Sequence, residues 1–327
     1  MRRHIPLVFC MALISMVALS GCVGQEKTGG PQYKNDVITI EDYYVSNLKP
    51  YAGSEATMEF LVQNNGENPM GRVKVDFFSL SGLTIVELKC SGTDPEYSAS
   101  RQSAGCTFDS TNAAGAIEPF DVRKVTMRLK MPDLELKTPK EFTVSYYVEY
   151  DYAGFRVANV PIVDGETVTK ASTSFSQSTS SYGPIRLDFE LPVRGEHKEN
   201  GQTVKEYWGV KGQPFEIKMK FTNVATSKLK DASPLLKAGK VRLDVKEMLN
   251  PMAGTGCGLC IGGASGCPGT NPKYAYPLKD VKVPAEVSCD FKPLGFETPE
   301  AMATMSADFS YTYRYVLSEK LSMQPLG

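Results

Sequence analysis

Apolar residues alternate with polar ones over much of this chain, and this period of two constrains its fold more than any other feature. Successive side chains of a β-strand point to opposite faces, so the alternation predicts strands that bury one face and expose the other. Helical spacing is limited to two short runs, 233–236 and 298–303, that are compatible with single turns. We therefore expect an all-β fold with two antiparallel β-sandwiches. The alternating runs are residues 56–62, 73–77, 125–131, 142–150, 185–193, 215–221, 241–245 and 307–315.

The two halves of the chain share several positions in the same order. Gly53 is followed by apolar residues at offsets of 5, 7 and 9 and by Asn64 at offset 11, and the same offsets lead from Gly212 to Asn223. Glycine suits a tight turn before a strand, and asparagine suits the turn after it. We interpret the shared order as a duplicated domain. Two further matches are Cys106-Thr107-Phe108 with Cys289-Asp290-Phe291, and Thr138-Pro139 with Thr298-Pro299.

Composition suggests where the domains begin and end. Residues 22–36 are polar and glycine-rich, and we expect them to form a flexible tether. Residues 164–184 include the Ser/Thr-rich stretch ASTSFSQSTSSYGP, and we expect them to form the linker between the domains. The expected domains are then residues 37–163 and residues 185–327.

The stretch from Tyr51 to Gly66 begins with a Tyr-x-Gly turn and continues as an alternating strand that ends in Asn and Gly. This pattern resembles the CARDB-type immunoglobulin-like domains of archaeal and bacterial surface proteins. The resemblance covers most of the first half and the strand pattern of the second half. It implies tandem Ig-like sandwiches of seven or eight strands each, used for adhesion, spacing or binding, and it brings no catalytic residues with it.

The N-terminal segment has the layout of a secretory signal peptide. Two arginines precede an uncharged apolar run, residues 5–19, and small residues follow it. The run is shorter than the roughly 20 residues that a membrane-spanning helix needs. The tetrapeptide Leu19-Ser20-Gly21-Cys22 resembles the lipobox of prokaryotic lipoproteins at all four positions. The resemblance implies cleavage of residues 1–21, lipid attachment to Cys22 and an extracytoplasmic protein anchored in a membrane. The alternative is an ordinary signal peptide, or an uncleaved anchor, with a chance cysteine.

The charge of the mature chain excludes some partners. Loss of residues 1–21 leaves 34 basic and 37 acidic residues, so the net charge is near −3. Neither this balance nor any basic stretch indicates binding to nucleic acid or to anionic lipid. The expected contact with the membrane is therefore through the lipid on Cys22.

Six cysteines remain after Cys22 and the signal peptide are set aside, and an even number in an exported chain predicts three disulfides. If Cys90 pairs with Cys106, the repeat makes Cys289 the counterpart of Cys106 and points to Cys257 as its partner. Cys260 and Cys267 would then close a small local loop.

The glycine-rich stretch 250–277 carries three of these cysteines and allows three interpretations. A disulfide-clamped loop suits an exported protein. A zinc site is the second, although the spacing C-x2-C-x6-C-x21-C lacks the second C-x2-C of a zinc ribbon. A redox C-x-x-C is the third, although the glycines argue against the helix that it needs. Such a loop is either a binding surface or an insertion that lengthens a hairpin.

Catalytic and ligand-binding signals are weak. His197 is the one histidine of the mature chain, lies in a polar run and is expected at the surface. Tyr207 and Trp208 could stack on a glycan if exposed, but packing under the turn at 209–212 is the favoured interpretation. Six tyrosines at alternating positions are expected in the core or at its rim rather than on a sugar-binding face; they are Tyr146, Tyr150, Tyr152, Tyr311, Tyr313 and Tyr315.

The sequence thus predicts a non-catalytic, lipid-anchored cell-surface protein that acts in envelope structure, adhesion or assembly of a surface complex. The expected partners are the membrane, through Cys22, and a protein at the cell surface. We expect no nucleic acid, cofactor or metal. The rival hypothesis is a solute- or glycan-binding lipoprotein that serves a transporter or hydrolase, and a polar cleft between the domains would favour it.

Overall fold

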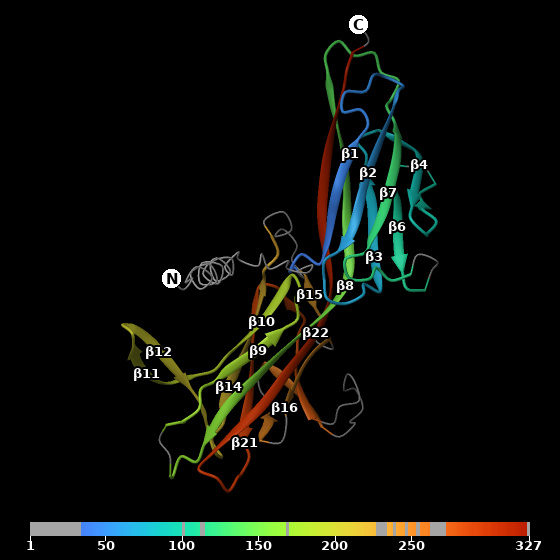
Figure 1. Ribbon diagram of the computed structural model, residues 1–327. Coiled ribbons are helices and arrows are strands. Elements are labelled where there is room, and N and C mark those ends of the chain that lie inside the picture. The colour runs from blue at the N-terminus through green and yellow to red at the C-terminus, as the bar shows by residue number, and fades with distance from the viewer. Residues whose placement is uncertain are drawn as a thin grey trace, which may run out of the picture. The chain divides into compact units, whose positions relative to one another are not determined.

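A computed structural model gives the fold (Figure 1) and describes residues 34–99, 102–111, 115–167, 170–226, 234–237, 240–245, 248–252, 256–261 and 273–325. These residues belong to one compact unit, Tyr33–Gly327. The expected signal peptide, Cys22 and most of the expected tether lie outside the described residues. Among the described residues, no helix is long and apolar enough to cross a membrane.

All the extended regular elements of the described residues are β-strands, as the alternation predicted. The sequence was compatible with single helical turns at 233–236 and 298–303, and the structure differs there. Leu235–Leu236 forms strand β15, and Glu300 begins strand β22. The side chains of β22 alternate between inward and outward positions, so pairing with its neighbours overrides the weak local helical spacing.

Two four-stranded antiparallel sheets form the outer layers of the molecule. The first has the order β1-β2-β7-β4 and the second the order β10-β14-β21-β17. The first comprises β1 (Ile38–Val45), β2 (Glu55–Asn64), β7 (Val122–Lys130) and β4 (Thr84–Cys90). The second comprises β10 (Ile185–Glu190), β14 (Phe215–Asn223), β21 (Ala285–Pro293) and β17 (Leu249–Met252).

A third, larger sheet runs behind both, with the order β18-β19-β16-β22-β8-β3-β6-β5, and β9 and β13 also pair with β8. Two small pairs complete the fold, the hairpin β11–β12 and the pair β15–β20. The large sheet comprises β18 (Cys257–Ile261), β19 (Lys273–Pro277), β16 (Val241–Val245), β22 (Glu300–Met323), β8 (Lys140–Val163), β3 (Arg72–Ser79), β6 (Ala104–Asp109), β5 (Glu96–Tyr97), β9 (Ser176–Ser180) and β13 (Gly209–Val210). The small pairs are β11 (Val193–Glu199), β12 (Gln202–Tyr207), β15 (Leu235–Leu236) and β20 (Val281–Lys282).

Strands β8 and β22 are each 24 residues long and pair antiparallel along their whole length, from Lys140 opposite Met323 to Val163 opposite Glu300. We call this pair the shared ladder, because it passes through both halves of the protein (Figure 1). Lobe 1 is β1–β7 with residues 140–152 of β8 and 311–323 of β22. Lobe 2 is β9–β21 with the remaining halves of the two long strands.

The shared ladder changes the expected domain division. Residues 37–163 and 185–327 do not form separate sets of strands, because each contributes one long strand to both lobes. Part of the expected linker, residues 164–184, is strand β9, which pairs with β8. The two halves are therefore interlocked through a continuous run of backbone pairing.

Each lobe buries its core between one outer sheet and the large sheet. In lobe 1 the ring of Phe60 on β2 stacks on Tyr146 of β8, with centroids 5.2 Å apart. In lobe 2 the ring of Phe221 on β14 meets Phe309 of β22 edge-on at 5.6 Å. The inward positions of the alternating strands are buried in both lobes, which matches the predicted cores.

The repeated turn chemistry is confirmed. Gly53 and Gly212 have φ angles of +68° and +74°, in the left-handed region that favours glycine. At the other end of each strand the asparagine side chain accepts a backbone N–H two residues on. The distances are 2.8 Å from Gly66 N to Asn64 Oδ1 and 3.0 Å from Ala225 N to Asn223 Oδ1. The repeated Thr-Pro pairs stand directly before the first residues of β8 and β22.

Candidate functional site

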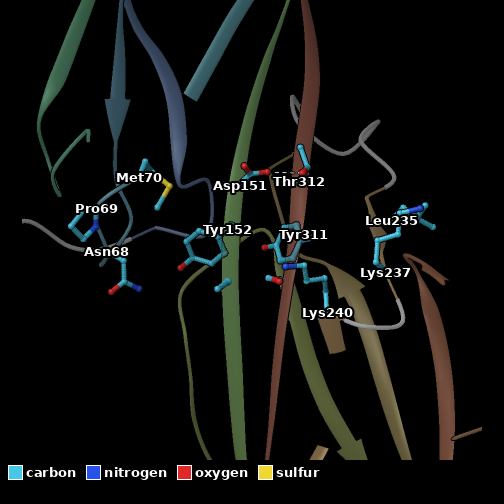
Figure 2. Close-up of a pocket in the computed structure, with 12 residues that line it drawn as sticks. Asn68, Pro69, Met70, Asp151, Tyr152, Leu235, Lys237, Lys240, Tyr311 and Thr312 are labelled. Carbon is cyan, nitrogen blue, oxygen red and sulfur yellow. Dashed lines mark hydrogen bonds between the residues drawn. The ribbon is translucent and has the colours of Figure 1, made fainter. Parts of the chain in front are cut away.

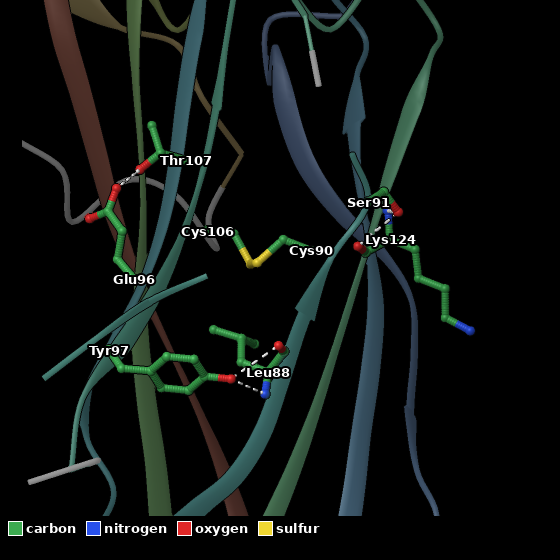
Figure 3. Close-up of a disulfide and its surroundings, with 8 residues drawn as sticks. All are labelled: Leu88, Cys90, Ser91, Glu96, Tyr97, Cys106, Thr107 and Lys124. Atoms are coloured by element: carbon green, nitrogen blue, oxygen red, sulfur yellow. Dashed lines mark hydrogen bonds between the residues drawn. A yellow bond between two sulfur atoms is a disulfide. The ribbon is translucent and has the colours of Figure 1, made fainter. Parts of the chain in front are cut away.

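In each lobe one disulfide joins the outer sheet to the large sheet. Cys90 of β4 is bonded to Cys106 of β6, and Cys257 of β18 is bonded to Cys289 of β21. In each case one cysteine lies in an outer sheet and the other in the large sheet. Figure 3 shows the first bond with Tyr97 beside it, whose hydroxyl accepts a hydrogen bond from Leu88 N at 2.8 Å. The first bond is the pairing that the sequence argument assumed, and the second is the pairing that it then predicted.

The second disulfide also decides between interpretations of the loop 250–277. Because Cys257 and Cys289 share a bond, their sulfurs are not thiolate ligands, and the four-cysteine zinc site is not formed. Cys267 and the side chain of Cys260 lie outside the described residues, so the third disulfide stays a prediction.

Cys106 and Cys289 do not occupy equivalent positions in the two lobes, although the repeat suggested that they do. Cys106 lies on β6, which pairs with β3 in the large sheet. Cys289 lies on β21, which pairs with β14 in an outer sheet and so corresponds to β7 rather than to β6. The match between the two Cys-x-Phe triplets is thus not a structural equivalence. Both bonds nevertheless cross the core between two sheets.

The middle of the shared ladder, which we call the waist, is lined with aromatic rings. The six tyrosines assigned to the core or its rim are all buried, so they do not form an exposed sugar-binding face. Five of these rings, all but that of Tyr146, make a chain of contacts with Phe309 that crosses from one lobe to the other. The centroid distances are 5.6 Å for Tyr150–Tyr313, 6.0 Å for Tyr152–Tyr311, 6.0 Å for Phe309–Tyr311, 6.5 Å for Tyr311–Tyr313 and 6.5 Å for Tyr313–Tyr315.

The first described residues, just before strand β1, also lie at the waist. Asp36 is buried, and its carboxylate accepts a hydrogen bond from the backbone N of Thr226 in lobe 2 at 2.9 Å. The hydroxyl of Tyr315 donates to the carbonyl of Ile38, two residues further along, at 3.0 Å. The first described residues therefore tie the start of lobe 1 to lobe 2.

A cavity of about 780 Å³ opens at the waist. This volume is in the range of small-molecule sites, roughly 300–1,000 Å³. Figure 2 shows the residues that line it, with Tyr152 and Tyr311 on the ladder and Lys240 extending toward them from the segment after β15. The lining comes from three places: Asn68, Pro69 and Met70; Asp151, Tyr152, Ala153, Ser310, Tyr311 and Thr312; and Leu235, Lys237 and Lys240.

The polar groups that line this cavity differ in whether they have a hydrogen-bond or ion-pair partner. Asp151 accepts a hydrogen bond from Thr312 Oγ1 at 2.6 Å, and Lys237 pairs with Asp280 at 2.9 Å. The hydroxyl of Tyr152 is buried and has no hydrogen-bond partner among the described residues. Burial, together with the charge of the Glu67 carboxylate, raises the pKa of Tyr152, so its hydroxyl stays a donor at neutral pH.

Tyr207 and Trp208 lie at the base of the hairpin β11–β12. Trp208 is 8% exposed and packs against Val163 and Ala171, as the favoured interpretation expected. Tyr207 is partly buried and meets Phe175 edge-on at 5.8 Å. The pair therefore does not form an open stacking platform.

His197 lies on β11 and is partly exposed, with its Nδ1 2.7 Å from Oε1 of Glu206. Glu206 also pairs with Lys170, and these contacts lower its pKa. A second cavity of about 390 Å³ lies beside them and also touches Tyr207 and Trp208. Among the described residues, no group of three or more His, Cys, Asp or Glu is placed to hold a metal ion.

Glu300, the first residue of β22, anchors the segment that precedes β9. Its carboxylate accepts four hydrogen bonds, from the backbone N and the hydroxyl of both Ser172 and Thr173. Desolvation opposes ionisation, but the hydrogen bonds outweigh it and lower the pKa of Glu300 to about 2. No sequence motif pointed to this contact, because its partners are more than 120 residues apart.

No known protein family matches this sequence, and no curated protein does. Several solved structures show a weak similarity to this chain. The C-terminal domain of the Streptococcus pyogenes antigen I/II-family protein AspA is 8% identical, with 88% of this chain and 99% of that chain covered and a TM-score of 0.22. The Actinomyces fimbrial adhesin FimA is 11% identical, with coverages of 80% and 82% and a TM-score of 0.20. The type II cohesin dyad of the Acetivibrio cellulolyticus scaffoldin ScaA is 9% identical, with coverages of 84% and 86% and a TM-score of 0.20. TM-scores near 0.2 establish neither a shared fold nor a shared function.

Proposed function

We propose that this chain is a non-catalytic, lipid-anchored surface protein whose two Ig-like lobes act as one stiff element in envelope structure or in the assembly of a surface complex. The observation that carries the proposal is the shared ladder, in which 24 residues of β8 pair with 24 of β22 without interruption. Domains that are connected only by a flexible linker move independently by default. Bending this chain at the waist would strain the backbone pairing and separate the rings of Tyr152 and Tyr311, which are in contact there.

Two further observations support an extracytoplasmic location. Disulfides persist in oxidising compartments, and this chain has two that staple the sheets of both lobes. The N-terminal sequence matches the lipobox pattern at Leu19-Ser20-Gly21-Cys22. Lipid on Cys22 would attach the chain to a membrane through a short polar tether that ends at Asp36, in the waist.

The full chain, expressed in a bacterium that processes lipoproteins, tests the anchoring. We expect the protein in the membrane fraction, with a mature N-terminal peptide that begins at Cys22 and carries the mass of a diacylglyceryl group. The Cys22→Ala variant should lose the lipid mass. A wild-type chain that is soluble and unmodified in this host would contradict the proposal.

The waist cavity favours a second candidate function, the capture of a small organic anion with an apolar body. The apolar side chains of Met70 and Leu235 line the cavity, Lys240 supplies a cation, and the hydroxyl of Tyr152 supplies a donor. The Tyr152 hydroxyl has almost no accessible surface, so an anion would displace the groups that cover it and then satisfy a hydroxyl that has no partner among the described residues.

A fluorescence titration with 1-anilinonaphthalene-8-sulfonate tests this second function. The Tyr152→Phe and Lys240→Gln variants should each lower the affinity about threefold to tenfold, as loss of one hydrogen bond or charge contact does. Tyr150→Phe is the matched control, because its hydroxyl is also buried and unpartnered among the described residues but does not line the cavity. Equal affinities for all three variants and the wild type would contradict a site at the waist.

A further inference from the structure

We propose that residues 315–318 of β22 dock an extended strand of a protein partner at the edge of lobe 1. The proposal rests on the assembly role proposed above and names the surface through which assembly would occur. It follows from a comparison of the two ends of the shared ladder, which have a similar construction but differ in the strands at the outer edge of the large sheet.

In lobe 2 the outermost long strand is β8, and β9 covers its outer edge. The covered residues are Arg156–Asn159, which pair antiparallel with Ser176–Ser180. In lobe 1 the outermost long strand is β22. Beyond the pairing of β22 with β16, which ends at Phe309, no strand of the described residues pairs with the outer edge of β22 along residues 314–318.

The position of the open edge follows from the ladder register. Tyr152 pairs with Tyr311 at the waist. The residues covered by β9 lie four to seven positions beyond Tyr152 on β8. The same distance beyond Tyr311 on β22 gives residues 315–318. Val316 in this stretch is 54% exposed.

Strand β9 shows what a covering strand does at such an edge. Besides its pairing with β8, it reaches the neighbouring edge strand β10 through the side chain of Gln177. The amide of Gln177 accepts from Phe189 N at 2.9 Å and donates to Phe189 O at 2.8 Å. One short strand thus provides hydrogen-bond partners for backbone groups of both sheets of lobe 2. Natural proteins otherwise protect such sheet edges with charged side chains or β-bulges.

Three exposed apolar side chains lie along the same side of lobe 1 as this edge of β22. Tyr44 lies on β1, the edge strand of the outer sheet, and the bond from Tyr315 to Ile38 brings β1 against β22. Leu48 and Tyr51 lie at the far end of the same edge, where Leu48 O accepts from Ser322 N and Tyr51 bridges Gln324. All three are more than half exposed.

These observations specify the kind of partner. It is an extended segment without proline that adds to β22 as a new strand. An amide or hydroxyl side chain should face β1, as Gln177 faces β10, and apolar side chains should lie toward Tyr44 and Val316. The chain's own residues 29–31, Gly-Gly-Pro, lack strand propensity. We therefore assign the edge to a separate protein rather than to the tether.

The test uses the chain's own covering strand as the probe. Residues 175–181 (FSQSTSS) are appended to the C-terminus of the full chain through a flexible Gly/Ser linker of about 15 residues, which spans about 20 Å. The target lies six to nine residues before Gln324, or about 20–30 Å at the rise of a strand. Such a linker gives the probe an effective concentration in the millimolar range.

Hydrogen exchange followed by mass spectrometry reads the outcome. We expect exchange of the amides in 315–318 to slow about tenfold relative to the chain without the probe. The same fusion with Gln177→Pro and Thr179→Pro in the appended copy should show no slowing. Val316→Lys in the fusion should reduce the slowing to less than about twofold. Val193→Lys, at a valine that is 44% exposed on the hairpin β11–β12, is the matched control and should not change it.

Two results would overturn the proposal. The first is unchanged exchange in 315–318 while the native β9–β8 pairing stays protected. The second is a dimer of the unmodified chain that Val316→Lys dissociates, which would assign the edge to a second copy. Neither result bears on the lipid on Cys22 or on the stiffness of the ladder, so failure here is distinguishable from failure of the proposed function.

Discussion

Gly154 offers a sharp test of how the waist is packed. It lies on β8 opposite Phe309 of β22, and the phenyl ring covers it. A Cβ at residue 154 would lie 2.5 Å from Cζ, 2.8 Å from Cε2 and 3.1 Å from Cε1 of Phe309. The ring has little freedom to move, because it also contacts Phe221 at 5.6 Å and Tyr311 at 6.0 Å.

We therefore expect Gly154→Ala to lower the free energy of unfolding by about 1–3 kcal/mol, the usual effect of overpacking a core. Phe309→Ala alone should lower it by about 3–5 kcal/mol, because it removes a buried ring. In the double variant the clash is absent, so Gly154→Ala should have almost no further effect. The two changes are thus expected to be strongly non-additive.

Urea denaturation followed by far-ultraviolet circular dichroism measures these differences. Gly71→Ala is the matched control, since no atom lies within 4 Å of a Cβ built there, and it should leave stability unchanged or slightly raised. The reasoning fails if Gly154→Ala is as stable as the wild type. It also fails if Gly154→Ala is equally destabilising with and without the Phe309 ring.

Two more predictions concern lobe 2 and its link to the ladder. Removal of the disulfide by Cys257→Ala with Cys289→Ala should lower the free energy of unfolding by about 3–4 kcal/mol, because the bond closes a loop with a sequence separation of 32. A urea midpoint equal to that of the wild type would contradict this prediction. Glu300→Gln should lower the melting temperature at pH 7. Because the pKa of Glu300 is lowered to about 2 from an ordinary 4.5, the stability that ionised Glu300 contributes is complete above pH 4.5 and lost as the pH falls toward 2. The difference in melting temperature between wild type and variant should therefore close over that range, and a difference that does not change with pH would contradict the assignment.

The strands and turns were predictable from the sequence because they depend on local patterns. Alternation at positions such as Met58 and Phe60 identifies the inward face of a strand whatever it pairs with. The turn glycines act on the local backbone, and the amide oxygens of Asn64 and Asn223 accept hydrogen bonds from groups two residues away. Local chemistry of this kind leaves a signature in a single sequence.

The shared ladder was not predictable in the same way. Alternation indicates which side chains are buried, but it does not say which strand lies alongside. In β8 the clear run of large inward residues ends at Tyr152, because the next inward position is Gly154. The ring of Phe309, which lies across the sheet, fills the space above that glycine. The strand therefore looked as if it ended near the waist, whereas it continues into lobe 2.

The waist cavity shows the same limit. Tyr152 and Tyr311 were recognised as core or rim positions, but Asn68, Lys237 and Lys240 carried no motif. They come together only because the loop after β2 and the segment after β15 both meet the middle of the ladder. Sites of this kind depend on contacts between segments distant in sequence.

The central claim is that the ladder makes the two lobes one cooperative unit, and the single tryptophan tests it most directly. Trp208 is buried in lobe 2, whereas the Cys90–Cys106 disulfide lies in lobe 1. Removing that disulfide with Cys90→Ala and Cys106→Ala should cost about 3 kcal/mol. We predict that the urea transition of Trp208 fluorescence moves to lower urea by that full amount and coincides with the circular dichroism transition. A Trp208 transition that stays at the wild-type midpoint, while circular dichroism shows a separate earlier step, would contradict the account.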